Sequence, residues 1–173
     1  MSDTNELHVS AIRSTDPYAA AASTLLTPTR QQADLVWESL VALATTRLID
    51  ERSETNLHAV VHIGMNLIPV RDFVMASIAL MEAEDAAPYL LALGACVGSA
   101  PAEYRGHVAA ATAMLSAAFD VDRSAVERLA RMGEGTSLAQ LVLKGLAMRA
   151  PASLYLQSMR HCMPQVKEQL QAL

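Results

Sequence analysis

Apolar side chains return every three or four residues along most of the chain after residue 30, which is the spacing of a helix with one buried face. Val36, Leu40 and Leu43 form the first such stripe, and the pattern predicts a long helix over residues 34–52. Residues 57–67 are apolar and rich in β-branched side chains, a composition that suits either a helix or a buried strand. We interpret this segment as a helix.

Prolines, glycines and capping residues divide the remaining sequence into further helices. The predicted helix starts are Pro69, Asp85, Pro101, Ser124, Ser137 and Pro151, and the predicted ends are Glu82, Gly98, Gly133 and Pro164. The helix after Pro101 is nearly all alanine on one side. Because small side chains let neighbouring helices approach closely, we expect this helix at the centre of the fold.

The sequence therefore predicts an all-α protein, an irregular multi-helix bundle of about seven to nine helices. Residues 1–30 lack sustained periodicity and contain Pro17 and Pro28, so we expect a flexible N-terminal arm. Every later connection is short, and residues 31–173 are predicted to form a single helical bundle domain.

Composition supports one globular domain: the chain has 173 residues, of which 52% are hydrophobic and 18% charged. These values exclude a disordered chain. Aromatic residues are only 4% of the chain, and nine methionines contribute to the apolar mass instead. We interpret most of these methionines as core filling, with an adaptable groove for a partner helix as the alternative.

The net charge of −5 is unevenly distributed. Residues 1–100 hold five arginines and twelve acids, whereas residues 101–173 hold eight basic residues and six acids. The densest basic cluster, Arg123, Arg128 and Arg131, includes Glu127, so we do not expect a nucleic acid partner.

No secretory signal is visible near the first residue, and the longest uncharged stretch, residues 86–102, is 17 residues long and broken by prolines and glycines. We therefore expect no membrane partner. Cys96 and Cys162 lie far apart in apolar surroundings, which favours reduced thiols. Together these features predict a cytoplasmic protein.

His58 and His62 are four residues apart and would share one face of a helix, which is the spacing of two zinc ligands in metalloproteases. The residues between them include no glutamate to act as general base. The possible third ligands are Cys96, His107, His161 and Cys162. We favour hydrogen-bonded or exposed histidines over a metal site.

No other catalytic pattern is present. The acids Glu82, Glu84 and Asp85 lie at a predicted helix junction, where capping explains them, and Asp120 and Asp122 are interpreted in the same way. The segment 133–135 is interpreted as a turn between helices. We therefore assign no catalytic, cofactor-binding or metal-binding residues, and expect no cofactor and no enzymatic activity.

Several features beyond residue 68 occur together in a recognisable order. They are Val70-Arg71-Asp72 at a helix start, Ala100-Pro101 before the alanine-rich helix, then Ser137-Leu138-Ala139 with Leu141 and a break at Pro151. Residues 68–164 thereby resemble the C-terminal part of an uncharacterised actinobacterial family, domain of unknown function 4192. Phe119-Asp120-Val121-Asp122 stands where that family usually has a Gly-Asp-Gly turn.

The resemblance implies no catalytic residues, and we interpret Arg71 and Asp72 as a structural pair that ties one helix to its neighbour. It implies a protein encoded by an actinobacterium or its phage, and eleven arginines against two lysines suit a GC-rich genome.

The function predicted from these observations is a non-enzymatic protein-interaction module of unknown partner that forms a homo-oligomer. One alternative is a small-molecule-binding helical regulator with an apolar pocket. A second alternative is a metal-dependent enzyme that uses His58 and His62.

Overall fold

The computed structural model describes residues 16–25 and 28–171. Over these residues the chain forms nine helices and no strand, so the predicted all-α class is confirmed. The helices are α1 (Pro17–Thr24), α2 (Arg30–Thr45), α3 (Glu51–Gly64), α4 (Ile68–Ala79), α5 (Ala83–Ser99), α6 (Ala102–Ala118), α7 (Arg123–Met132), α8 (Ser137–Ala147) and α9 (Ala152–Gln171).

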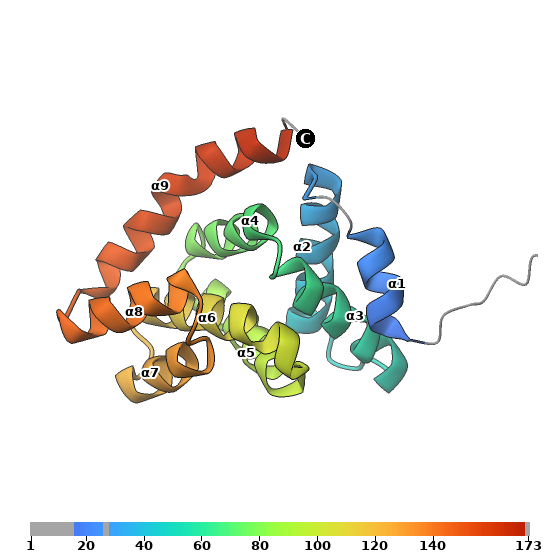
Figure 1. Ribbon diagram of the computed structural model, residues 1–173, viewed down its shortest axis with the longest axis horizontal. Helices are drawn as coiled ribbons and strands as arrows, with labels where there is room; N and C mark the ends of the chain where they lie inside the picture. The colour runs from blue at the N-terminus through green and yellow to red at the C-terminus, as the bar shows by residue number, and fades with distance from the viewer. Residues whose placement is uncertain (1–15, 26–27, 172–173) are drawn as a thin grey trace, which may run out of the picture.

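The helices are arranged along the molecule's long axis (Figure 1). Helices α1, α2 and α3 lie at one end and α7 and α8 at the other. Helix α9 runs from the α8 end across α4 and reaches α2, and its most extensive packing is against α4.

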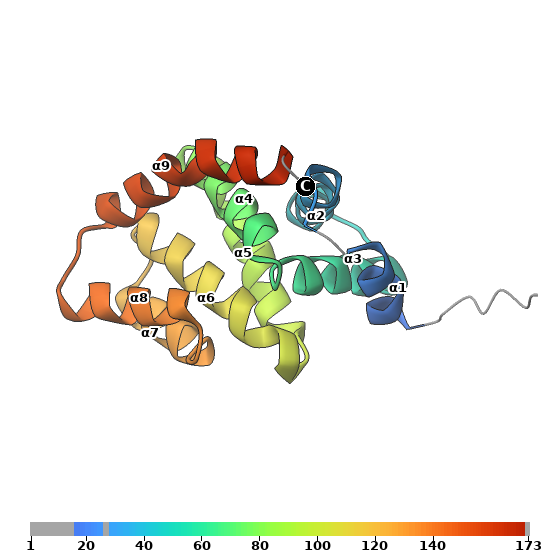
Figure 2. The same cartoon turned by 45° about the horizontal axis from the view of Figure 1, so that its top comes forward.

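Helix α6 is the centre of the bundle. Eleven successive residues, 108–118, are buried, so this part of the helix is covered on every side. It packs on α5, α7, α8 and α9, and Figure 2 shows it between α5 and the α7–α8 pair. The expectation that the alanine-rich helix occupies the centre is confirmed.

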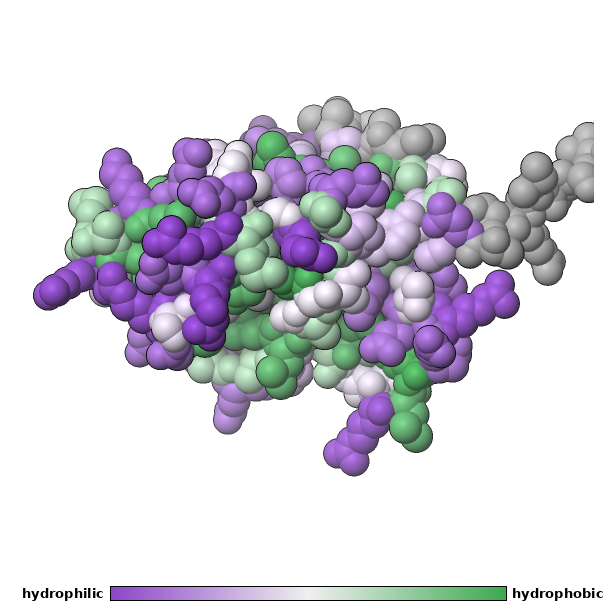
Figure 3. Space-filling model, turned by 60° about the horizontal axis from the view of Figure 1, so that its bottom comes forward, coloured by the Kyte–Doolittle hydropathy of each residue, from purple (hydrophilic) through white to green (hydrophobic). Residues whose placement is uncertain are grey.

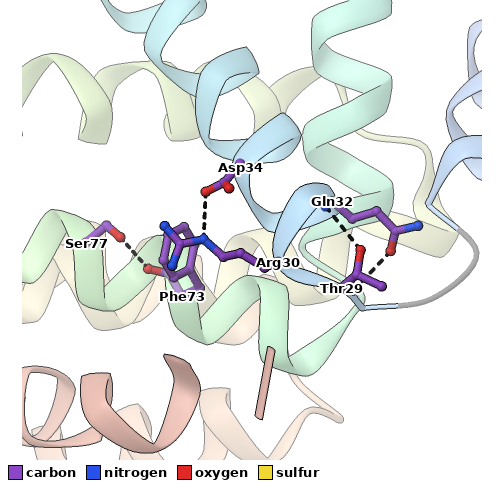
Figure 4. Close-up of polar contacts among 6 residues, drawn as sticks. All are labelled: Thr29, Arg30, Gln32, Asp34, Phe73 and Ser77. Atoms are coloured by element: carbon purple, nitrogen blue, oxygen red, sulfur yellow. Dashed lines mark hydrogen bonds and ion pairs between the residues drawn. The ribbon is translucent and has the colours of Figure 1, made fainter. Parts of the chain in front are cut away.

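The start of α2 is fixed by a capping box and by a contact to α4 (Figure 4). The Thr29 hydroxyl accepts the backbone N–H of Gln32, whose side chain accepts the N–H of Thr29 in return. The Arg30 guanidinium lies 4.8 Å from the centre of the Phe73 ring and donates to Asp34 at 2.9 Å. These contacts start the helix one turn earlier than predicted.

The predicted arm of residues 1–30 is too long. Residues 17–24 form α1, whose N-terminus is capped by the Asp16 carboxylate accepting the N–H of Tyr18 at 2.9 Å. Helix α1 packs on α3 and buries Ala21, because its alanine face fits closely against the neighbouring helix. The rest of the predicted arm, residues 1–15, lies outside the described residues.

The single helix predicted over residues 34–52 is instead two helices. Helix α2 ends at Thr45, and the Asp50 carboxylate accepts the N–H of Ser53 at 3.0 Å to begin α3. A capping aspartate offers the backbone an alternative to helix continuation, and this local hydrogen bond outweighs the apolar spacing. The helix favoured over residues 57–67 is confirmed up to Gly64.

Three predicted N-caps are displaced. Asp122 caps α7 by accepting the N–H of Ala125, and Thr136 caps α8 by accepting the N–H of Ala139, so neither Ser124 nor Ser137 is the cap. Helix α5 begins after Glu82, which places Asp85 in its first turn, where a carboxylate favours the positive end of the helix dipole.

Pro164 does not end the last helix, which continues to Gln171. A proline inside a helix removes one hydrogen bond and costs about 3 kcal/mol. Val166 and Leu170, both beyond the proline, are 4% and 2% exposed. Burial of each such side chain contributes about 1.5–3 kcal/mol, which offsets the cost.

Helices α2 and α3 approach closely at Gly64. A Cβ atom built at Gly64 would lie 2.3 Å from Cγ2 of Val36, which is far below normal contact distance. Gly94 in α5 has no atom within 4 Å of the same position. The two helical glycines therefore form a matched pair, one crowded and one open.

We expect Gly64→Ala to lower the free energy of unfolding by about 1–3 kcal/mol, because the added methyl group overpacks the α2–α3 contact. Gly94→Ala should raise it by about 0.5–1 kcal/mol, since alanine is the better helix former at an open site. Urea denaturation of both variants checks this. Equal stability of the two variants would contradict the close approach.

Candidate functional site

The histidine pair singled out from the sequence lies on α3, facing α5. The rings of His58 and His62 have centroids 5.8 Å apart and are tilted by 51°. Nε2 of His62 is 2.7 Å from the carbonyl oxygen of Cys96, and its Nδ1 is 2.8 Å from the hydroxyl of Tyr18. Nδ1 of His58 is 2.7 Å from the hydroxyl of Ser99.

These contacts fix the protonation of His62. A carbonyl oxygen only accepts, so Nε2 carries the hydrogen and donates to Cys96. Nδ1 then accepts from the Tyr18 hydroxyl, and both ring nitrogens are used. Burial lowers the pKa of His62 because it disfavours the charged form.

His62 is therefore a buried residue whose two ring nitrogens are both hydrogen-bonded. Throughout residues 16–25 and 28–171, no three histidine, cysteine or acidic side chains lie together as a metal site would require. Cys96 is fully buried, and burial raises the pKa of its thiol to about 12, while Cys162 is exposed on α9.

The same contacts attach α1 to the bundle. The Tyr18 ring stacks on His62 at 5.9 Å and on Tyr104 of α6 at 5.5 Å, with planes inclined by 9° and 5°. Burial raises the pKa of the Tyr18 hydroxyl, which keeps it a donor to His62. Sequence reasoning missed Tyr18 because it placed that residue in the arm.

The remaining chemical candidates lie at helix ends, in a turn or within one helix. Asp122 caps α7, and residues 133–135 form the turn between α7 and α8, as interpreted. Arg71 and Asp72 pair at 2.7 Å, but both belong to α4, so their ion pair does not tie one helix to another. The Arg71 side chain is only 9% exposed. Glu84 and Asp85 are exposed in the first turn of α5.

A surface between α8 and α9 has the character of a binding site. A cavity of about 330 Å³ lies there, with Met114 of α6 and Gly145 of α8 among its lining residues. Around it stand Leu141, Met148 and Leu154, which are 54%, 72% and 53% exposed. We call these three residues the α8–α9 apolar face. Large contiguous apolar patches on a protein surface often mark interaction sites.

Other parts of the surface are more mixed. Figure 3 shows a face on which apolar side chains lie in small groups among polar ones. A larger cavity, of about 680 Å³, lies between α1, α2 and α3, but charged Glu51 and Arg52 contribute to its wall. The α8–α9 cavity combines an apolar wall with an exposed apolar rim, and we take it as the candidate site.

The inner wall of this cavity contains a tyrosine hydroxyl without a partner. Tyr155 is 6% exposed, and its oxygen has no hydrogen bond within the described structure. The ring reaches this position because Gly145 has no side chain: a Cβ there would lie 2.1 Å from the Tyr155 oxygen. Burial also raises the pKa of Tyr155. A glycine inside the apolar pattern of α8 was the available sequence signal.

The methionines divide between two roles. Met65, Met75, Met114, Met159 and Met163 are buried, which confirms core filling for these five. Met148, by contrast, is 72% exposed at the edge of the cavity. Met132 is also exposed, but it does not line the cavity, so among the exposed methionines of the described residues the groove alternative applies to Met148, directly after α8.

No protein-family model, curated protein or solved structure matches the chain. The resemblance of residues 68–164 to domain of unknown function 4192 stays a prediction.

Across the described ranges, no single helix has the length and apolar character needed to cross a membrane. Helices α3 and α4 reach that threshold only when taken together, and they are bent by 110° at their junction.

We expect the unfolding free energy to fall as pH falls below about 6.5, the ordinary histidine pKa. The folded-state pKa of His62 is lowered, so the unfolded chain binds more protons in this range and the loss grows on acidification. His58 and His107 act in the same direction because burial also lowers their pKa values. Each group steepens the slope by at most about 1.4 kcal/mol per pH unit.

Urea denaturation between about pH 7.5 and 5.5 checks this slope. His62→Gln should flatten it, since glutamine can still donate to the Cys96 carbonyl but does not titrate. His161→Gln, at an exposed position on α9, is the control for the replacement of a histidine by glutamine. Equal slopes for wild type and His62→Gln would contradict the neutral, buried His62.

We expect Tyr155→Phe to keep or raise the unfolding free energy by up to about 1 kcal/mol, because it removes a buried hydroxyl that bonds nothing. Tyr18→Phe is the matched control. It removes the donor to buried His62 and should cost about 1–3 kcal/mol. Thermal and urea unfolding compare the two, and a greater loss in Tyr155→Phe would reveal a partner for its hydroxyl.

Proposed function

We propose that this chain is a non-enzymatic protein-interaction module and that the α8–α9 apolar face is its docking surface. The observation that carries the proposal is the exposure of Leu141, Met148 and Leu154 around one concave cavity. Covering large apolar side chains contributes about 25 cal/mol for each Å² removed from water. A partner that buries this face therefore gains affinity without any change in the fold.

A small-molecule-binding regulator is the second candidate, favoured by the cavity of about 330 Å³, which is within the range of ligand pockets. Such sites enclose most of their ligand. Here more than half of each side chain in the α8–α9 apolar face lies in solvent, outside the cavity. A small ligand would leave this area uncovered, so we rank a protein partner first.

A metal-dependent enzyme is the weakest of the three. It needs a lone pair on both His58 and His62, but the nitrogens of His62 are committed to Cys96 and Tyr18. A metal on either nitrogen of the buried His62 ring would have to displace one of these hydrogen bonds.

We further propose a cytoplasmic location, a source in an actinobacterium or its phage, and self-association. The free cysteines Cys96 and Cys162 suit a reducing compartment. The uncovered α8–α9 apolar face is also the surface that a second copy could bury, since symmetric dimers use the same patch on both subunits.

We expect serine substitution of the α8–α9 apolar face to lower partner capture and self-association by about tenfold or more, with unfolding free energy within about 1 kcal/mol of wild type. The measurements are cross-linked capture from an actinobacterial lysate with mass spectrometry, and light scattering of the purified protein. The substitutions are Leu141→Ser, Met148→Ser and Leu154→Ser.

The matched control replaces three other exposed leucines that are 93%, 55% and 77% exposed, namely Leu48, Leu80 and Leu91. Proteins captured specifically should be lost with the first variant and retained with the control. If both variants capture the same proteins as wild type, the α8–α9 apolar face is not the docking surface.

A further inference from the structure

The chain segment that forms the α8–α9 apolar face carries only positive charge. Residues 135–163 contain Lys144, Arg149 and Arg160 together with His161, and no acid. The rest of the protein is rich in acids, and the whole chain has a net charge of −5. These basic residues, which we call the basic rim, are therefore a local feature of the protein and do not follow from its overall composition.

The positive groups flank the apolar cavity. Lys144 is exposed and lines the cavity directly. Arg160 and His161 line a neighbouring shallow hollow on α9, and the two hollows share Leu154 and Ser158 in their walls. No acid lines either hollow. The rim therefore presents cations on both the α8 and the α9 side.

None of these basic side chains has an ion-pair partner among the residues that the structure describes. The three ion pairs among the described residues are Arg30–Asp34, Arg71–Asp72 and Glu127–Arg131, so none includes a rim residue. Arg160 is held in place because its Nε–H donates to the carbonyl oxygen of Ala79 at 2.5 Å. A cation fixed in this way loses little side-chain freedom when a carboxylate binds.

Helix α9 adds to the positive potential at this face. Its N-terminus lies at Ala152, close in sequence to Leu154, and its first turn contains no acid. The start of a helix has the effect of a partial positive charge, which attracts anionic groups of a partner.

The shape of the α8–α9 apolar face favours a helix of a partner protein over a small ligand. Leu141 and Met148 are seven residues apart and continue one side of α8, while Leu154 stands opposite on α9. An amphipathic helix, about 10 Å wide, can cover both sides with apolar residues at every third or fourth position. A fatty acid could fill the cavity but would leave the three exposed side chains uncovered.

We propose that an acidic amphipathic helix of a partner protein docks on the α8–α9 apolar face, with its carboxylates beside Lys144 and Arg160. This inference rests on the proposed function and names the chemistry of the partner. Apolar contacts supply affinity, and the basic rim selects acidic partners and speeds their association.

Three synthetic helical peptides test the inference. They share one leucine face and carry Glu, Gln or Lys on the polar face, and fluorescence anisotropy measures their binding to the full chain. The Glu peptide should bind about tenfold more tightly than the Lys peptide, with the Gln peptide between them, and added salt should reduce the difference.

Lys144→Gln should weaken the Glu peptide several-fold and leave the Gln peptide unchanged. Lys167→Gln is the matched control, because Lys167 is the only other lysine, is exposed on α9 and lines neither hollow. Both variants remove one exposed positive charge, so a loss caused by net charge alone would be equal in the two. An equal loss overturns the placement of the carboxylate at Lys144.

Four outcomes overturn the inference: equal binding of the Glu and Lys peptides, no binding of any peptide at about 1 mM, tighter binding of decanoate than of the Glu peptide, or tighter binding of a single-stranded oligonucleotide. Equal binding that the triple serine variant abolishes would remove the charge preference and leave the proposed function intact. The proposed function is tested separately. It fails if the triple serine variant captures the same proteins as wild type.

Discussion

The burial of α6 on all sides is the constraint on which the rest of this structure depends. Residues 108–118 contact neighbours at every position around the helix, and most of them are alanines. Side chains this small allow α5, α7, α8 and α9 to pack closely around one axis. The buried hydroxyl of Thr112 is satisfied within the helix, where it donates to the carbonyl of Val108 at 2.7 Å. Thr112 therefore needs no polar partner from another element.

With the centre filled by small residues, individual large side chains fix the outer helices. At one end, Tyr18 stacks between His62 and Tyr104 and donates to His62, which itself donates to the Cys96 carbonyl. One neutral histidine thus connects α1, α3 and α5. At the other end, Tyr155 of α9 fits against Gly145 of α8. Each contact depends on a single residue, His62 at the first end and Gly145 at the second, whose role no neighbouring residue can fill.

The candidate site follows from incomplete coverage of α8. This helix buries Ala139 and Val142 against α6 and α7, whereas Leu141, on another side, has no covering helix. The start of α9 narrows the gap and forms the cavity but leaves Leu154 half exposed. An apolar wall therefore lies beside Lys144, which has no ion-pair partner among the described residues.

The sequence by itself determined the all-α class, the central alanine-rich helix and the turn at residues 133–135, because helical spacing and small residues are local properties. It could not separate Thr136 from Ser137 as the cap of α8, since both side chains cap well and only the hydrogen bond to Ala139 decides. The sequence also could not predict that the last helix continues past Pro164, because burial of the residues beyond the proline depends on tertiary packing. Leu141 and Val142 are adjacent and equally apolar, yet one is 54% exposed and the other fully buried. Exposure depends on which distant helices cover a side chain, and so the tertiary structure alone revealed the candidate site.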